Sequence, residues 1–322
     1  MDVTGPDSTF CAQALWITAP GRCELRPVTV EAQGRPVVRT AFTGISRGTE
    51  ATVLAGRVPP SEHARMRGPH QEGEFTFPVK YGYAAVGMAE TGDLAGRWVF
   101  CLHPHQDRFA ADPALLTPVP DGVPPARAVL AANMETALNI VWDAALRTGD
   151  RINVFGAGVV GALCAHLAAR IAGTEVRLVD TDPSRAAVAA ALEVPFGPPH
   201  PEADVAINAS GSDAALATAL NTCGPEARVV EASWYGDRSA SIPLGGAFHA
   251  RRLRIVSSQV GQVAAAQRAR WPHARRMAKA LDLLADDRLD ALVSGESAFG
   301  ALAQDYPGIL SSSGTLCHRI TY

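Results

Sequence analysis

The segment Gly156-Ala157-Gly158-Val159-Val160-Gly161 constrains the fold of this chain more than any other feature. The strand-like run Asn153-Val154-Phe155 comes directly before it, and a largely apolar helical stretch, 159–171, continues from it. A short apolar run followed by glycines and then by a helical pattern predicts a strand, a tight turn and a helix. Glycines at this spacing in this context are typical of a loop that holds the pyrophosphate of a dinucleotide.

Each position of this loop has a separate physical task. Gly156 permits the tight turn, Gly158 lets the backbone approach a pyrophosphate without a Cβ, and Gly161 lets the helix pack closely on the strand. The first amides of the helix, at Val159 and Val160, have no partner within the helix and lie at its positive dipole end. We therefore expect these five residues to bind the phosphates of the cofactor.

A carboxylate ends the next predicted strand, because Asp180 follows the run 175–179. A carboxylate in this place accepts hydrogen bonds from both ribose hydroxyls and repels a 2′-phosphate, so it favours NAD over NADP. Arg185 weakens this preference, and Asp182 offsets Arg185. The alternative is that Asp180 or Asp182 only caps a helix in an ordinary strand–helix turn.

Two later loops follow further apolar strands and are expected at the same edge of a sheet. Ser210-Gly211 follows the strand predicted at 205–208, and Trp234-Tyr235 follows the strand predicted at 227–232. Ligands of doubly wound sheets bind at the carboxyl ends of the strands, so we expect these four residues to contact the cofactor. Trp234 and Tyr235 have two other interpretations, an aromatic wall for a flat substrate and packing between domains.

The wider pattern separates a β-rich part from a part in which strands and helices alternate. Short strand-like runs broken by glycine and proline suggest a barrel or sandwich; they are 14–18, 28–30, 37–42, 83–89 and 97–102. After a proline-rich connector at 118–125 the chain becomes helical, and apolar strands between helices then predict a parallel sheet covered on both faces. A helix at 271–285 and a strand-like tail at 317–322 complete the pattern.

Composition excludes several classes of protein. Among the 322 residues, 47% are hydrophobic, 19% are charged and the formal net charge is −3. This is ordinary for a globular protein and offers no broad basic face for nucleic acid. The six cysteines contain no CxxC pair, the opening segment 1–9 is polar and acidic, and no apolar run is long enough to span a membrane. We expect a cytoplasmic protein that acts on a small molecule.

Several segments together resemble the medium-chain dehydrogenase/reductase superfamily over nearly the whole chain. They are Ala14–Gly21, Thr43–Glu50, Gly82–Gly87 and Ala132–Ala137. The Ser46–Glu50 string, Ser-Arg-Gly-Thr-Glu, is similar to a zinc-lacking branch whose members are often named zinc-binding alcohol dehydrogenases, and the bacteriochlorophyllide hydroxyethyl dehydrogenases are distantly similar.

This resemblance implies an α/β protein with a GroES-like β-barrel catalytic domain and a Rossmann domain with a doubly wound parallel sheet. It implies a catalytic domain at 1–132, a dinucleotide-binding domain at 133–259 and a return segment at 260–322 that completes the catalytic domain. It also favours a homodimer, in which 242–244 and 253–256 would supply the edge at which the sheet continues into a second subunit.

The departures from the family pattern concern zinc. Zinc-dependent members place a cysteine at the position of Ser46, a histidine–glutamate pair at Tyr83-Ala84 and a third ligand near Ala132. Ser46, Tyr83 and Ala132 do not form a credible set of zinc ligands. The four-cysteine structural zinc lobe of the family is also missing. We therefore expect no bound zinc.

Without zinc, hydrogen-bond donors have to stabilise the negative charge that builds on a carbonyl oxygen during hydride transfer. Tyr83 is the first candidate, because it stands at a former ligand position and a phenol donates to an oxyanion; the alternative is a tyrosine that only packs by its ring. Ser46 lies on another loop, 43–50, together with Arg47 and Glu50, and this loop is expected to face the cleft. Arg47 could instead clamp the cofactor phosphates or pair with Glu50.

The resemblance places Glu135 and Thr136 beside the nicotinamide ring. Thr136 would orient the cofactor, and Glu135 would relay a proton, cap a helix or pair with an arginine. His103 and His105 could shuttle protons near neutral pH, although a barrel histidine with satisfied hydrogen bonds is the better interpretation of either one.

Three functions remain open from the sequence. The first is a metal-independent, NAD(H)-dependent oxidoreductase that acts on a secondary alcohol or ketone of a fairly bulky molecule. The second is an NADPH-dependent reductase of a carbon–carbon double bond in a quinone or enone, against which Asp180 argues. The third is a non-catalytic dinucleotide sensor or scaffold.

Overall fold

The computed structural model describes residues 9–322, so most of the polar opening segment lies outside the described residues. The chain forms two compact units. The first contains the residues up to Ala132 together with Met277–Tyr322, and the second is the continuous segment Asn133–Arg276. Among the described residues, no helix is both long and apolar enough to cross a membrane.

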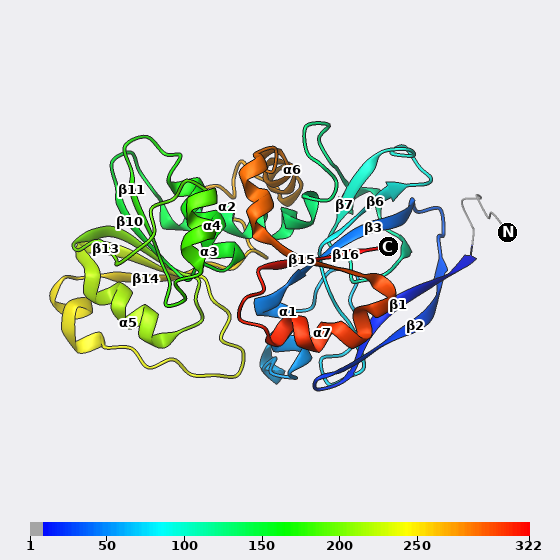
Figure 1. The fold of residues 1–322 in the computed structure, drawn as a ribbon, viewed down its shortest axis with the longest axis horizontal. Helices are drawn as coiled ribbons and strands as arrows, with labels where there is room; N and C mark the ends of the chain where they lie inside the picture. Colours follow the sequence, from blue (N-terminus) through cyan, green and yellow to red (C-terminus); the bar gives the residue numbers. More distant parts are fainter. Residues whose placement is uncertain (1–8) are drawn as a thin grey trace. The chain divides into compact units, whose positions relative to one another are not determined.

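The first unit is built from two mainly antiparallel sheets (Figure 1). The first sheet has the order β2-β1-β5-β4, and the second has the order β15-β16-β3-β6-β7-β9 with β8 also paired to β3. The strands are β1 (Thr9–Ala19), β2 (Arg22–Glu31), β3 (Val37–Ser46), β4 (Glu72–Gly73), β5 (Val79–Lys80), β6 (Ala85–Ala89), β7 (Trp98–Cys101), β8 (Arg108–Ala110), β9 (Thr117–Pro118), β15 (Val293–Ala298) and β16 (Cys317–Thr321).

Alternation along the strands gives the sheets one buried and one exposed face. In β1, Phe10, Ala12 and Ala14 are buried while the residues between them are exposed, and the first two pack with Val37 and Ala110 in one core cluster. The strand-like tail is confirmed as β16, which pairs with β3 on one side and with β15 on the other.

The helices of the first unit join its strands. They are α1 (Arg47–Leu54), α7 (Leu302–Ser311) and the 3₁₀ turns Pro60–Glu62, Pro113–Leu115, Ala128–Leu130, Asp287–Leu292 and Phe299–Ala301. Helix α1 and helix α7 contact each other. The expectation that 47–50 forms a loop is therefore wrong: Ser46 ends β3 and α1 begins at once. The Glu50 carboxylate accepts the Ser46 N–H at 2.6 Å, which satisfies a donor at the start of the helix.

The second unit holds a five-stranded parallel sheet of order β11-β10-β12-β13-β14. Its strands are β10 (Arg151–Phe155), β11 (Glu175–Val179), β12 (Ala203–Asn208), β13 (Cys223–Glu231) and β14 (Arg254–Ser257). Its helices are α2 (Ala131–Ala144), α3 (Val159–Ala168), α4 (Arg185–Ala191), α5 (Asp213–Thr222) and the π-helical turn Leu244–Phe248, and α6 (His273–Leu283) spans the passage to the first unit.

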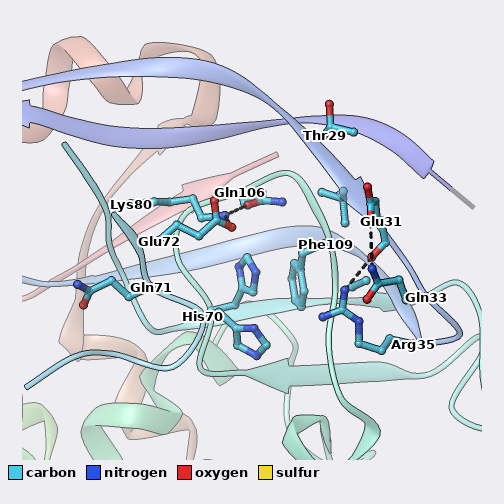
Figure 2. A pocket seen from close by; sticks show the side chains of 13 residues that line it. Thr29, Glu31, Gln33, Arg35, His70, Gln71, Glu72, Lys80, Gln106 and Phe109 are labelled. Carbon is cyan, nitrogen blue, oxygen red and sulfur yellow. Dashed lines mark hydrogen bonds and ion pairs between the residues drawn. The ribbon is translucent and has the colours of Figure 1, made fainter. Parts of the chain in front are cut away.

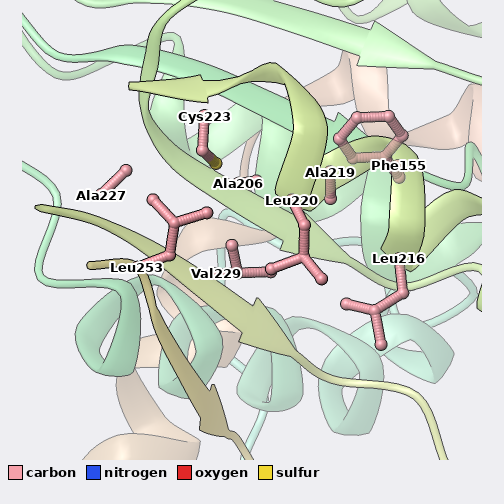
Figure 3. Close-up of a cluster of buried hydrophobic side chains, with 9 residues drawn as sticks. All are labelled: Phe155, Ala206, Leu216, Ala219, Leu220, Cys223, Ala227, Val229 and Leu253. Atoms are coloured by element: carbon pink, nitrogen blue, oxygen red, sulfur yellow. The ribbon is translucent and has the colours of Figure 1, made fainter. Parts of the chain in front are cut away.

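Apolar residues of β10, β12, β13 and α5 form a buried core cluster against this sheet (Figure 3). Phe155, Leu216, Leu220 and Val229 are all less than 5% exposed, so the strands are covered as a parallel sheet requires. The strand order reverses between β10 and β12, and ligands of such sheets bind at this point, beyond the carboxyl ends of the strands.

Two differences from the sequence-based expectation concern Tyr83 and the edge of the parallel sheet. The strand expected at 83–89 begins only at Ala85, so Tyr83 precedes it. Residues 242–244 do not form a strand, and Leu244 instead begins the π-helical turn. Pro243 has no N–H to give to a sheet ladder, and Gly245-Gly246 favours irregular backbone. Of the two segments expected at the sheet edge, only 253–256 coincides with a strand, β14, which is one of the two edge strands of the sheet; β11 is the other.

Candidate functional site

The glycine loop follows β10 and its backbone is packed too tightly for side chains at two positions. Gly156 has a φ of +94°, and a Cβ there would lie 2.8 Å from the backbone of Ser210. A Cβ on Gly161 would lie 1.8 Å from the Gly156 carbonyl oxygen. Glycine is required at both positions because any larger residue would push the turn away from the helix or from the loop after β12.

Gly158 differs from the other two glycines because a Cβ there would meet nothing within 4 Å. It is the N-cap of α3, whose first residues are Val159 and Val160, and no side chain among the described residues 9–322 caps the helix. Unpaired amides and the positive dipole end therefore lie next to open space. This arrangement fits the pyrophosphate of a dinucleotide, since an anion there completes the hydrogen bonds of the helix.

Asp180 directly follows β11 and is tied to the glycine loop. Its Oδ2 accepts the Ala157 N–H at 2.6 Å, and its Oδ1 accepts the Asp182 N–H at 2.9 Å. These two bonds fix the carboxylate beside the loop while each oxygen retains a lone pair. Arg185 is only 7% exposed and its Nε lies 3.6 Å from Asp182 Oδ2. Both interpretations of Asp180, ribose binding and capping, are compatible with this geometry.

The loops after β12 and β13 are joined by a hydrogen-bond network. Asn208 Nδ2 donates to Glu231 Oε2 at 2.6 Å, and Ser210 Oγ donates to Asn208 Oδ1 at 2.6 Å. The Gly211 N–H donates to the Ser233 hydroxyl at 2.9 Å. Because Ser210 also packs against Gly156, the structure brings Ser210 and Gly211 together with the glycine loop.

Glu231 and Asn208 organise this network, and sequence reasoning did not single them out. The signal was present, because each is a polar residue at the end of an apolar strand. The Tyr235 hydroxyl lies 3.4 Å from Glu231 Oε2, and burial, with the Glu231 charge as a further cause, raises the pKa of Tyr235 to about 12. Trp234 is half-buried.

In the first unit, the structure brings Tyr83 and Ser46 together. The Tyr83 hydroxyl is hydrogen-bonded to the side chains of Ser46 and Thr49. Burial raises the pKa of Tyr83 well above its ordinary value of 10.0, and the negative charge of Glu50 raises it further. The phenol is therefore a neutral hydrogen-bond donor at physiological pH. We call Tyr83, Ser46 and Thr49 the Tyr83 group.

Glu50 fixes the start of α1 next to the Tyr83 group. It is completely buried, and its carboxylate receives the Ser46 N–H at 2.6 Å, the Tyr306 hydroxyl at 2.6 Å and His105 Nε2 at 3.0 Å. Nδ1 of His105 lies 2.7 Å from the Thr43 hydroxyl. Glu50 therefore pairs with His105 and Tyr306, and the alternative that it pairs with Arg47 receives no support from these contacts.

The positions at which the resemblance expects zinc ligands hold Ser46, Tyr83 and Ala132. Among residues 9–322, no three His, Cys, Asp or Glu side chains lie together in a way that could hold a metal ion. A hydroxyl, a phenol with a raised pKa and a methyl group are poor donors for zinc. The residues present thus do not fit the catalytic zinc of the resemblance.

Glu135 and Arg276 form a buried ion pair within the second unit. Arg276 Nε donates to Glu135 Oε1 at 3.0 Å, and the two side chains are 2% and 7% exposed. Arg276 also donates to Asn139 Oδ1 and to the Val260 carbonyl. Burial raises the pKa of Glu135 although Arg276 opposes this. Of the roles considered for Glu135, this contact supports the pair with an arginine. Thr136 is partly buried on α2.

His103 is a packing residue rather than a member of the Tyr83 group. Its ring stacks on Phe109 with centroids 3.9 Å apart, and its Nδ1 lies 2.9 Å from the Pro104 carbonyl oxygen. Burial holds the pKa of His103 well below its ordinary value. In the described part of the chain, no hydrogen bond or ring contact joins it to Tyr83. His103 is neutral, so we do not retain it as a proton shuttle.

No family model matches the sequence. Several solved structures are similar over almost their whole length. L-idonate 5-dehydrogenase from Escherichia coli K-12 aligns with a TM-score of 0.81 at 13% identity and covers 98% of this chain and 99% of its own. TarJ from S. aureus in complex with NADPH aligns with a TM-score of 0.75 at 13% identity (97% and 99%). A short chain alcohol dehydrogenase, rspB, from E. coli CFT073 with NADH aligns with a TM-score of 0.73 at 14% identity (97% and 99%).

At these identities the comparison establishes the fold. The chain combines a GroES-like β-barrel with a Rossmann-type parallel sheet, and the predicted fold class is confirmed. Dehydrogenases of this fold are found with NADH and with NADPH, so the fold alone does not select between the two cofactors.

Proposed function

We propose that this chain is a medium-chain-type dehydrogenase that uses NAD(H), without a metal, to interconvert a secondary alcohol and a ketone. The observation that carries the proposal is the Gly156–Gly161 loop. It opens onto free space at Gly158 and at the α3 N-terminus, and the Asp180 carboxylate is bonded to its backbone. Solved dehydrogenases of the same fold with bound NADPH or NADH support the cofactor class.

In this proposal, residues of the second unit bind the cofactor. The amides of Val159 and Val160 would hold the pyrophosphate, and Asp180 would accept the ribose hydroxyls and disfavour a 2′-phosphate. Ser210 and Gly211 belong to the adjoining loop, which the Asn208–Glu231 network keeps rigid. When bound, the nicotinamide supplies or accepts the hydride.

The residues of the first unit supply polarisation of the substrate oxygen. Tyr83 carries its proton throughout the physiological pH range and would donate a hydrogen bond to the oxygen on which negative charge develops. Ser46 and Thr49 orient the phenol. Glu50 fixes Ser46 through its backbone N–H. The same hydrogen bond stabilises the charge on oxygen in both directions, so the proposal covers ketone reduction and alcohol oxidation alike.

A binding titration tests the cofactor assignment. NADH should quench the intrinsic fluorescence at lower concentration than NADPH, and Asp180→Ser should reverse or abolish this preference because the 2′-phosphate is no longer repelled. Asp204→Asn is the control. The Asp204 carboxylate accepts the Arg151 N–H at the start of β10, which is the end of that strand away from the glycine loop. Tighter binding of NADPH by the unaltered protein would contradict the assignment.

A turnover assay and a metal analysis test the chemistry. We expect the protein to oxidise NADH in the presence of some members of a panel of bulky ketones. Dialysis against a chelator should cause no loss of this activity, and the purified protein should contain no stoichiometric zinc. Preference for quinones or enones would identify a double-bond reductase instead, and tight binding without turnover would identify a sensor. One zinc per chain would overturn the metal-free mechanism.

A further inference from the structure

A polar cavity of about 390 Å³ lies within the first unit, separate from the Tyr83 group and from the glycine loop. Its wall comes from β2, from the segment before β5, and from the stretch 103–110. Figure 2 shows two charged groups of side chains on its sides, Lys80 with Glu72 and Arg35 with Glu31, and the rings of His70 and Phe109 between them. None of these residues has a part in the proposed reaction.

Lys80 is the most unusual residue of the cavity. It is 2% exposed, and the chain contains only one other lysine, Lys279. Its Nζ donates to Glu72 Oε1 at 2.5 Å and to Gln106 Oε1 at 2.8 Å, which uses two of its three hydrogens. Glu72 is the only carboxylate within residues 9–322 that pairs with this ammonium, and its side chain is 57% exposed, so water screens the pair. The buried positive charge is therefore incompletely compensated.

His70 adds a buried nitrogen without a partner. Within residues 9–322, His70 Nε2 is buried and makes no hydrogen bond. Burial lowers the pKa of His70, and the positive charges of Lys80 and then Arg35 lower it further, so both cations act at this ring. Unpaired buried polar atoms are rare in proteins and call for an explanation such as a missing ligand.

Arg35 provides a third donor. Its Nε donates to the Ala32 carbonyl at 3.0 Å and its Nη2 to the Glu31 carbonyl at 2.7 Å, which fixes the guanidinium on the turn after β2. Its Nη1 makes no hydrogen bond to any residue that the structure describes. A guanidinium held by two backbone bonds with one free nitrogen is already oriented for an anion.

The carboxylates of the cavity are less buried than the lysine. Glu31 is exposed and bonded to Gln33 Nε2, and Glu72 is mostly exposed. A carboxylate with this exposure can turn toward water at small cost, whereas Lys80 cannot leave. An anion that enters would replace Glu72 as the partner of Lys80 and also meet the donors of His70 and Arg35.

We propose that this cavity binds a small tetrahedral oxyanion, either inorganic phosphate or the phosphoryl group of a phosphate monoester, through Lys80, His70 and Arg35. Three donors from three segments suit an anion with several equivalent acceptor oxygens. The cavity has room for the phosphoryl group and a short organic portion. The site is independent of the proposed reaction, so its failure would leave that proposal intact.

Lysine-labelled protein gives a direct test, because only Lys80 and Lys279 contribute side-chain signals to its NMR spectrum. Phosphate added at constant ionic strength, with chloride as the balancing salt, should move the Lys80 signal saturably and leave Lys279 unchanged. Equal movement of both signals, or no movement of Lys80, would overturn the proposal.

Substitutions give a second test by calorimetric titration with phosphate. Lys80→Met should weaken binding by about tenfold or more because a charge-assisted bond is lost. The matched control Lys279→Met, which removes an exposed lysine on α6, should bind as the unaltered protein does. His70→Asn keeps a side chain that tolerates the φ of 57° at this position and should also weaken binding.

Two ligands distinguish the source of the anion. Tighter binding of glycerol phosphate than of inorganic phosphate would assign the site to a phosphorylated metabolite, and the reverse would assign it to free phosphate. Equal binding of phosphate by the unaltered protein, Lys80→Met and His70→Asn would show that the cavity is not the site.

Discussion

At the scale of single residues, the raised pKa of Tyr83 leads to a first prediction. Tyr83→Phe should lower kcat for ketone reduction by about a hundredfold, because one donor to the developing oxyanion is lost. Since burial and the Glu50 charge raise the pKa of Tyr83 above 10.0, its ionisation should leave no limb in the pH profile of kcat below that pH.

The measurement is kcat against pH for the unaltered protein and the variant. Tyr81→Phe is the matched control, because Tyr81 is a buried neighbour whose ring packs against Tyr83. A Tyr83→Phe protein that folds and retains full turnover would remove Tyr83 from the mechanism.

The ion pair between Arg276 and Glu135 gives a prediction about stability. Arg276→Met should lower the free energy of unfolding by about 3 kcal/mol at neutral pH, because it leaves a buried carboxylate without a counter-ion. Removing Arg276 raises the folded-state pKa of Glu135 further above its ordinary value of 4.5. A raised folded-state pKa of a carboxyl group favours the folded state at low pH, and this advantage is lost as the pH rises through that pKa.

The difference in the free energy of unfolding between Arg276→Met and the unaltered protein should therefore be smallest near pH 4.5 and should grow toward pH 8. Urea unfolding at the two pH values measures it, and Arg275→Met on the exposed side of α6 serves as the control. A difference that does not grow with pH would mean that Glu135 remains protonated in both proteins.

Several individual roles could be anticipated from the sequence and others could not. The strand before Gly156 and the helical pattern after Gly158 and Gly161 are both visible in the neighbouring sequence, so the positions of these three glycines could be predicted. The partner of Glu135 is 141 residues away in sequence, at Arg276, and no local signal connects them. Glu50 was noticed, but its contacts with His105 and Tyr306 arise only when distant segments fold together.

At the scale of elements, Gly161 and Gly158 at the α3 turn allow effects on stability and effects on cofactor binding to be tested separately. Gly161→Ala should destabilise the protein by several kcal/mol, because the Cβ would lie 1.8 Å from the Gly156 carbonyl oxygen. Gly158→Ala meets nothing within 4 Å and should leave the melting temperature unchanged while NADH binding weakens by about tenfold or more. Thermal unfolding and NADH titration of both variants measure this. Unaltered NADH affinity in Gly158→Ala would place the cofactor elsewhere.

Strongly periodic elements were predicted well and short ones were not. The strand at 175–179 was predicted with its observed bounds, because Val176, Leu178 and Val179 favour a strand and Gly173 and Asp180 bound the run on either side. Helix α1 was missed because Gly48 and Thr49 are poor helix formers. The hydrogen bond from the Ser46 N–H to the buried Glu50 carboxylate stabilises the start of the helix instead. The strand expected at 242–244 failed at Pro243.

At the scale of the whole molecule, the two units differ in how the chain builds them. The second unit is continuous and has its own sheet and core, so a fragment of residues 131–284 should fold alone and bind NADH. A fragment of residues 1–132 should not reach a native fold, because β3 would lack β16. Circular dichroism and NMR dispersion of both fragments test this. Well-dispersed spectra from the 1–132 fragment would show that the barrel does not need its last strands.

The position of β16 between β15 and β3 also sets an order of events during synthesis. Residues 317–321 leave the ribosome long after β3, so the nascent first unit waits with one edge of β3 open while the whole second unit emerges. An open strand edge on a ribosome-bound chain is a place where neighbouring nascent chains join. Slow translation of residues 133–316 would prolong that exposure, and a chaperone that covers strand edges would have most to do in that interval.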